Sequence, residues 1–196
     1  MKLRNKNLKI LKSNHVYSEE MEHDACGVGL VASTEGLKSR KVVEYGIDAL
    51  KAVWHRGAID ADGKTGDGAG IHIEIPKDFF EEKIEVTGHK HDNSELCVGM
   101  IFLPRNDYSA QEQCRTIVES ELTKRNFSIY GWRQVPVDPS VLGEKAEQTR
   151  PEITQVLFTY NDKKVVNKSL EQKLYETRRV IEKEALNNQL NNFYIC

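Results

Sequence analysis

Short apolar runs and alternating apolar and polar residues mark the segments that are predicted to form strands. The run at 26–32 carries two glycines and no charge, and the run at 96–103 is apolar throughout, a pattern typical of buried strands. Residues 71–76 alternate and end in a proline. Further strands are predicted at 128–137 and 153–160, and the apolar residues at 192–196 begin one more.

Apolar residues at helical spacing predict helices at 39–55, 78–84, 109–125 and 169–188. The first is expected to end at Gly57, because glycine suits the left-handed position that follows a helix. The last carries one apolar face, formed by Leu170, Leu174, Val180, Ile181 and Leu186. Strands and helices in mixed order, with neighbouring strands able to pair as hairpins, predict an α+β or layered α/β fold.

Composition and charge exclude several classes of protein. The 196 residues are 39% hydrophobic and carry a net charge of −2, so the basic excess of a nucleic-acid-binding protein is missing. No apolar stretch approaches the ~20 residues that span a bilayer, and no apolar segment of a signal peptide follows the N-terminal lysines. Four scattered cysteines without a CxxC pair give no disulfide framework or zinc site, and the expected compartment is a reducing cytoplasm.

The two ends of the chain differ from its middle. Residues 1–25 are polar and charged with little apolar periodicity, so we expect a leader that precedes the folded domain at 26–196. The apolar run at the C-terminus stops as soon as it starts. We therefore expect this chain to be the N-terminal part of a longer domain.

The glycine- and aspartate-rich loop from Asp60 to Gly70 resembles three ligand-binding motifs without matching any of them. Between Gly57 and Gly63-Lys64-Thr65 it has one residue too many for a phosphate-binding P-loop. The twelfth position of a calcium loop that starts at Asp60 is Ile71 rather than a glutamate. The glycines are one residue short of the dinucleotide fingerprint. The loop is therefore interpreted as a glycine-rich turn.

His89-x-His91 lies in a polar segment and is interpreted as a solvated pair rather than a metal site.

Cys26 is the candidate nucleophile. It stands at the start of a predicted buried strand, directly after the leader, and is followed by Gly-Val-Gly. If the bond from Ala25 to Cys26 is cut, the new α-amine, with a reference pKa of about 7.7–8.0, can act as the base for the thiol. The alternative is a buried structural cysteine in an uncleaved chain, and residue spacing alone does not decide between the two.

Several motifs closely resemble the start of the large subunit of bacterial glutamate synthases. They occur in the order of that family and cover nearly the whole chain. They are Asp24-Ala25-Cys26-Gly27-Val28-Gly29, His55-Arg56-Gly57-Ala58, Thr65-Gly66-Asp67-Gly68-Ala69-Gly70-Ile71, Tyr130-Gly131-Trp132-Arg133-x-Val135-Pro136-Val137-Asp138 and Phe193-Tyr194-Ile195-Cys196.

The resemblance implies an amidotransferase domain with an N-terminal cysteine, in the four-layer α/β/β/α sandwich of the N-terminal-nucleophile hydrolases. It implies that the leader is removed and that Cys26 attacks the side-chain amide of L-glutamine, forming a glutamyl thioester. Arg56 matches an arginine that lies close to the cysteine and organises the site. Gly27 keeps side chains away from the nucleophile, and the loop that contains Asp67 and Gly68 lines the mouth of the pocket. No metal site is expected among the residues of this chain.

The resemblance also implies parts that these residues lack. The oxyanion-hole Asn-Gly, the arginine for the glutamine α-carboxylate and the 2-oxoglutarate site lie beyond residue 196, so the sandwich is incomplete at its C-terminus and we expect the isolated fragment to be inactive. FMN and an iron–sulfur cluster belong to the remainder, which would receive the ammonia, and the resemblance implies a small NADPH-dependent subunit as a further partner. None of these cofactors is expected in this chain, and neither nucleic acid nor membrane is an expected partner. The alternatives are another class II glutamine amidotransferase or a non-catalytic α/β interaction module.

Overall fold

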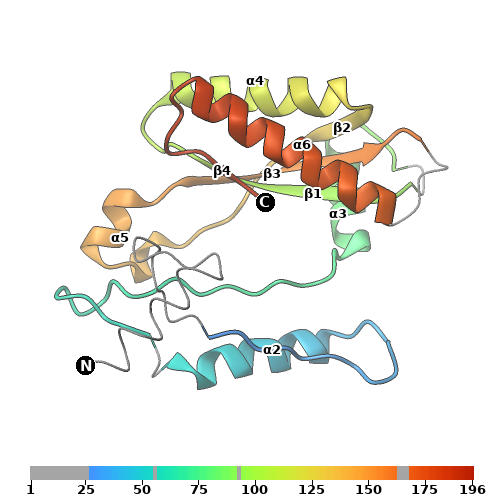
Figure 1. Ribbon diagram of the computed structural model, residues 1–196. Coiled ribbons are helices and arrows are strands. Elements are labelled where there is room, and N and C mark those ends of the chain that lie inside the picture. Colours follow the sequence, from blue (N-terminus) through green and yellow to red (C-terminus); the bar gives the residue numbers. More distant parts are fainter. Residues whose placement is uncertain (1–26, 55–56, 92–93, 163–167) are drawn as a thin grey trace, which may run out of the picture. The chain divides into compact units, whose positions relative to one another are not determined.

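The computed structural model describes residues 27–54, 57–91, 94–162 and 168–196. The chain divides into two compact units, one formed by Met1–Gly57 with Ala69–Ile71 and the other by Ala58–Gly68 with His72–Cys196. The second unit contains an antiparallel sheet with helices packed against it, so the α+β class is confirmed (Figure 1).

The sheet consists of strands β1 (Leu96–Leu103), β2 (Phe127–Gln134), β3 (Glu152–Tyr160) and β4 (Tyr194–Ile195), in the order β2-β3-β1-β4. β1 and β3 pair from Leu96↔Thr159 to Leu103↔Glu152. The predicted strands 96–103, 128–137 and 153–160 are therefore confirmed, and the run at 192–196 does begin a strand. β2 ends before the predicted boundary, near Pro136, which has no N–H for a ladder.

A bulge in β2 explains one motif of the sequence. The pairing of β2 with β3 shifts between Ile129 and Gly131, and Gly131 has a φ of 153°. A Cβ atom at Gly131 would lie 2.9 Å from Cγ2 of Thr87. Glycine is therefore required here both by the backbone conformation and by the close approach of Thr87.

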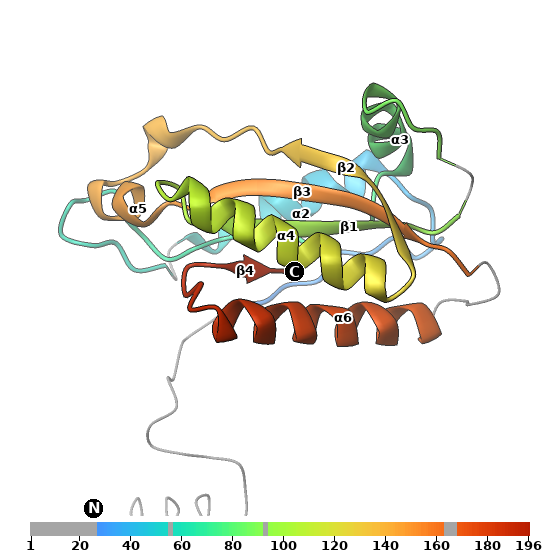
Figure 2. The ribbon, with the colours of Figure 1, turned by 90° about the horizontal axis from the view of Figure 1, so that it is seen from above.

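Helices α4 (Tyr108–Lys124) and α6 (Lys168–Asn187) pack side by side over one face of the sheet (Figures 1 and 2). Asp107 caps α4 by accepting from the N–H of Ala110. Apolar side chains alternate along β1 and β3 and meet the apolar stripes of both helices. The buried core between them includes Ile101, Leu103, Cys114, Val118, Val156 and Ile181.

The opposite face of the sheet is covered at one end by α3 (Lys77–Val86), whose Phe80 and Ile84 pack on Leu96 and Leu157. Along the rest of that face, Met100, Phe102 and Ile153 are only half-buried. The two faces of the sheet are thus covered unequally by the described residues of this unit.

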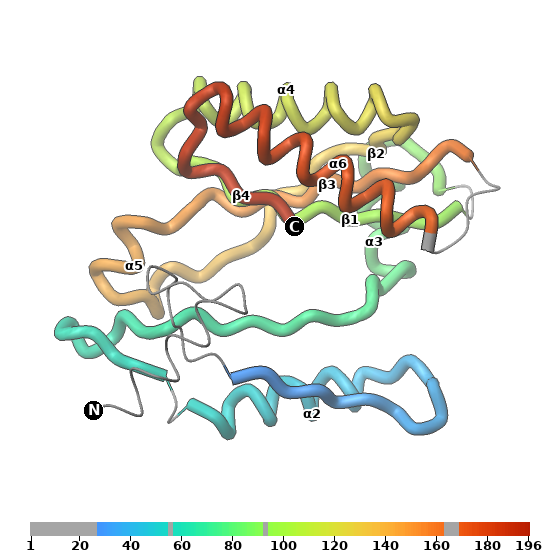
Figure 3. Tube along the Cα trace, in the orientation of Figure 1, coloured from blue at the N-terminus to red at the C-terminus, as the bar shows by residue number. Residues whose placement is uncertain are grey.

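The first unit contains α2 (Arg40–Ala52), as predicted, with Ser39 as its N-cap. Its C-cap is Val53, so the expected ending at Gly57 is wrong. The tube trace in Figure 3 follows this helix and the extended segment before it.

Two predicted strands are corrected. Residues 27–32 and 71–76 form no strand, and Val28 and Leu30 are 96% and 91% exposed. An apolar run becomes a strand only when a neighbouring strand satisfies its N–H and C=O groups, and neither segment has such a neighbour among the described residues. Cys26, the predicted first residue of the earlier strand, lies outside the described residues.

Two smaller expectations are also corrected. Leu186 is 68% exposed rather than part of the apolar face of α6, where Thr177 and Ala185 are buried. The side chain of His91 is only 5% exposed, and its Nδ1 lies 3.0 Å from Oε1 of Glu81, so the expectation of a solvated pair is wrong for His91, whereas His89 is exposed as expected. The ring of His91 packs against Tyr130, which excludes water from it.

Candidate functional site

The predicted site residues fall into two groups. Cys26 and Arg56 lie outside the described residues, so their proposed roles stay predictions. Gly27 is exposed, and a Cβ at this position would meet nothing within 4 Å. Asp67 and Gly68 lie in the loop 58–68 of the second unit, whose geometry can be followed in detail.

The loop 58–68 is a small hairpin closed by hydrogen bonds. Ile59 and Gly66 form an antiparallel bridge, and the N–H of Asp60 donates to the carbonyl of Thr65 at 2.7 Å. The carboxylate of Asp67 accepts from the N–H of Ala58 at 2.9 Å. Asp67 thereby joins the two ends of the hairpin, a role that needs no ligand, and its contact with a substrate stays a prediction.

The tip of the hairpin is organised around Asp62. Its Oδ1 accepts from the N–H groups of Lys64 and Thr65 at 2.9 and 2.7 Å, and its Oδ2 accepts from the hydroxyl of Thr65. The Thr65 hydroxyl, with these N–H groups and that of Lys145, holds the pKa of the Asp62 carboxyl well below its usual range. Asp62 is therefore a fixed anion at neutral pH.

A second segment of the chain supports this hairpin. Residues 139–149, which we call the supporting segment, comprise the 3₁₀ turn η2 (Pro139–Val141) and the helix α5 (Glu144–Thr149). Nζ of Lys145 donates to both carboxylate oxygens of Asp60 at 2.8 and 2.7 Å. Gly143 lies so close to the hairpin that a Cβ there would be 2.2 Å from Oγ1 of Thr65.

Sequence reasoning missed Lys145 and Gly143. The sequence analysis predicts no element between the strands at 128–137 and 153–160, and no spacing rule connects residues that are 85 positions apart. The one available signal was local, because a glycine directly before a short polar helix is common at helix starts and at close backbone contacts.

The described cysteines are poor candidates for a nucleophile. Cys97 and Cys114 are buried in the core, where desolvation raises the pKa of their thiols to about 12 and about 11. Desolvation also raises the pKa of Cys196. Because the thiolate is the reactive form, none of these three is activated near neutral pH.

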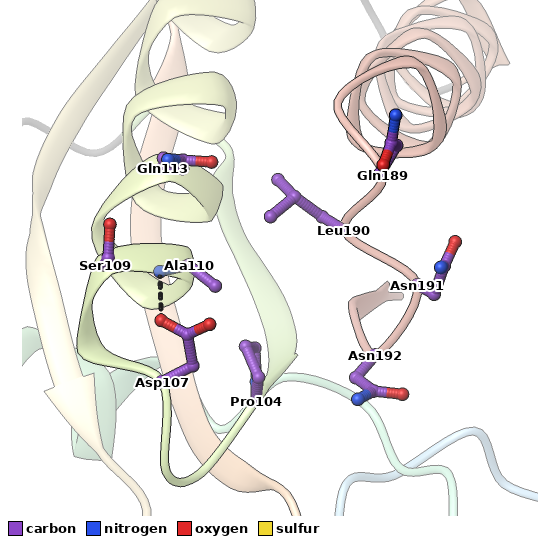
Figure 4. Close-up of a pocket in the computed structure, with 9 residues that line it drawn as sticks. All are labelled: Pro104, Asp107, Ser109, Ala110, Gln113, Gln189, Leu190, Asn191 and Asn192. Atoms are coloured by element: carbon purple, nitrogen blue, oxygen red, sulfur yellow. Dashed lines mark hydrogen bonds between the residues drawn. The ribbon is translucent and has the colours of Figure 1, made fainter.

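A hollow of about 310 Å³ lies between the start of α4 and residues 189–192, and none of the predicted site residues lines it (Figure 4). Leu190 and amide side chains such as Gln113 and Asn192 face it, together with the Asp107 cap of α4.

The described ranges contain no cluster of three or more His, Cys, Asp or Glu side chains placed to bind a metal ion. None of their helices combines the length and the apolar character that a membrane span needs.

Comparison with known proteins relates nearly the whole chain to glutamate synthases. It is 53% identical over 190 residues to the glutamate synthase [NADPH] large chain of Azospirillum brasilense, covering 97% of this chain and 12% of that protein. It is 35% identical over 192 residues to the ferredoxin-dependent glutamate synthase of Pyropia yezoensis, covering 96% and 12%. The chain thus spans about one eighth of the length of these relatives.

A family profile defines which residues of the chain belong to a known domain family. The profile of the family "Glutamine amidotransferases class-II" matches residues 26–196, which begin at the candidate nucleophile and include the whole hairpin and its supporting segment. With more than four fifths of its length inside that match, the chain belongs to the class-II glutamine amidotransferases.

Proposed function

We propose that this chain is the glutamine-hydrolysing part of a glutamate synthase, with Cys26 as the nucleophile. The observation that carries the proposal is that the family match begins at residue 26 and that this residue is a cysteine. The buried environments of Cys97 and Cys114 add support, since they remove two of the other three thiols as candidates.

In the proposed reaction, removal of residues 1–25 gives Cys26 a free α-amine. The amine takes the proton of the thiol, and the thiolate attacks the side-chain carbonyl carbon of L-glutamine. The carbon–nitrogen bond then breaks, and ammonia leaves with the proton that the amine returns. Water hydrolyses the resulting thioester, which releases glutamate and restores the thiol. Arg56, Gly27, Asp67 and Gly68 would organise this site.

We further propose the four-layer α/β/β/α sandwich as the fold of the complete domain. The unequal cover of the sheet supports this, because half-buried Met100, Phe102 and Ile153 form an apolar surface that a second layer would bury. In the same proposal the complete protein lies in the cytoplasm and passes ammonia to 2-oxoglutarate. FMN and an iron–sulfur cluster, in parts outside this chain, would supply the redox chemistry, with a small NADPH-dependent subunit as partner.

The test combines intact mass with chemical labelling of the complete protein purified from its native source. We expect a species that starts at Cys26 and takes up one equivalent of a diazoketone analogue of glutamine. Cys26→Ala should abolish both labelling and glutamate release, whereas Cys196→Ala, the matched change at an exposed thiol, should leave both intact. Retention of the Ala25–Cys26 bond without labelling would contradict the proposal and favour a non-catalytic module.

A further inference from the structure

The hairpin 58–68 has no apolar core of its own. Apart from Thr65 all of its residues are exposed, so its conformation depends on hydrogen bonds and on contacts with the rest of its unit. A hairpin of this size is marginal in water unless another element fixes it. The supporting segment is the described element that makes these contacts.

Several contacts join the hairpin to the supporting segment. Lys145 binds both carboxylate oxygens of Asp60, the N–H of Ala146 points to Oγ1 of Thr65 at 3.4 Å, and Gly143 packs directly on the Asp62–Thr65 turn. The Gly143 contact involves the backbone N of Thr65, 2.4 Å from the position of a Cβ. A larger residue at 143 therefore cannot be accommodated by a side-chain rotation alone.

The supporting segment is in turn tied to the end of the sheet. Glu147 of α5 accepts from Arg105, which follows β1, and from Nε of Arg150 at 2.8 Å. These guanidinium groups also lower the pKa of the Glu147 carboxyl, so that the pairs persist at neutral pH. A continuous series of polar contacts thus runs from the end of β1 through α5 to the hairpin.

We propose that the supporting segment positions the hairpin for glutamine binding, with Lys145 and Gly143 as positioning residues. The inference rests on the proposed function, in which Asp67 and Gly68 line the glutamine pocket. Neither Lys145 nor Gly143 touches the substrate in this proposal. They act by fixing Asp60 and the Asp62–Thr65 turn, and through them the strand of the hairpin that carries Asp67.

The test uses steady-state glutamine hydrolysis by the complete glutamate synthase of the proposed function, expressed from its native gene. Lys145→Met should raise KM for glutamine by about two- to fivefold, the range that an exposed ion pair supports, while kcat stays near its parent value. Gly143→Ala should raise KM by more, because the hairpin backbone must move. Lys183→Met, at an exposed helix lysine, is the matched control and should leave KM unchanged.

A charge exchange separates positioning from a general loss of stability. In the double variant with Asp60→Lys and Lys145→Asp, KM should return most of the way from the raised value of either single variant to the parental value. The urea midpoint for hydrogen exchange of the β1 amides should stay unchanged. A parental KM in both Lys145→Met and Gly143→Ala, or no recovery in the exchanged pair, would overturn the inference. If Gly143→Ala fails to fold, the exchanged pair alone decides.

The same experiments distinguish this inference from the proposed function. Glutamine hydrolysis that persists in Cys26→Ala would remove the proposed function, whatever Lys145 does. Hydrolysis that is lost in Cys26→Ala but proceeds with parental KM in the Lys145 and Gly143 variants would remove only the positioning role.

Discussion

Strand β1 and the hairpin 58–68 belong to the same unit but are held in place by opposite kinds of interaction. β1 has no charged residue, and its Ile101 and Leu103 are completely buried against helices α4 and α6. The hairpin buries almost nothing and is shaped by the carboxylates of Asp60, Asp62 and Asp67. Removing apolar volume should therefore unfold the first region, whereas removing charge should only loosen the second.

The largest effect is expected in the core. Ile101→Ala leaves a cavity at a fully buried position and should lower the free energy of unfolding by about 2–5 kcal/mol. The measurement is the urea midpoint for hydrogen–deuterium exchange of the peptide that contains β1. Ile73→Ala, at a position that is 44% exposed, is the matched control and should change this midpoint much less.

Glu121 tests whether a carboxylate contributes more to the free energy of unfolding when it is buried on helix α4. Its side chain is only 8% exposed, and it accepts from Lys124 at 2.7 Å and from Arg125. Glu121→Ala should cost about 1–3 kcal/mol, because two cations lose their buried partner. Glu112→Ala, on the same helix with a side chain that is 74% exposed, should cost less than ~0.5 kcal/mol.

The same carboxylate predicts a dependence of stability on pH. The hydrogen bond from Lys124, with that from Arg125 to the same carboxylate, lowers the pKa of Glu121 below the usual value of 4.5. A lowered pKa in the folded state means that the stabilisation is present above the unfolded pKa and is lost as pH falls through the folded one. The wild-type and Glu121→Gln midpoints should therefore converge in acid, and a constant difference down to that range would contradict this assignment.

Within the hairpin, Asp62→Ala should produce a local effect. Loss of three accepted hydrogen bonds should speed amide exchange at Lys64 and Thr65 several-fold, while the exchange midpoint of β1 stays unchanged. Since the pKa of Asp62 is lowered, its hydrogen bonds should survive mild acid and be lost only as pH falls through that low value. A change in the β1 midpoint would show that hairpin and core are not independent.

The smallest effect is expected on the outer surface of α6. Arg179 is 58% exposed and pairs with Glu182, which also has Arg178 within 3.5 Å. Arg179→Ala should change the unfolding free energy by less than ~0.5 kcal/mol, because water and Arg178 replace the lost partner. A larger loss in the β1 exchange midpoint would mean that surface charge contributes to the core after all.

The contrast also explains which parts of the molecule could be predicted from sequence. The apolar pattern located β1, β3 and α4 within a residue or two, because burial against a neighbour imposes a period on the chain. It failed at 27–32 and 71–76, where the same pattern has no neighbouring strand to pair with among the described residues. The hairpin was identified as a glycine-rich turn, but its support by Lys145 depends on a distant contact that no local rule encodes.

The sheet order has a consequence for synthesis on the ribosome. Ser94 and Thr159, hydrogen-bonded at adjoining ends of β1 and β3, are 65 residues apart in the chain. At 5–20 residues per second, the ribosome needs roughly 3 to 13 s to add that stretch. During this interval β1 is an uncharged apolar segment that lacks its pairing partner β3, and segments of this type aggregate readily. Helix α4 is made directly after β1 and packs on its Ile101 and Leu103 side. It therefore becomes available to shield this face of β1 from water before β3 is made.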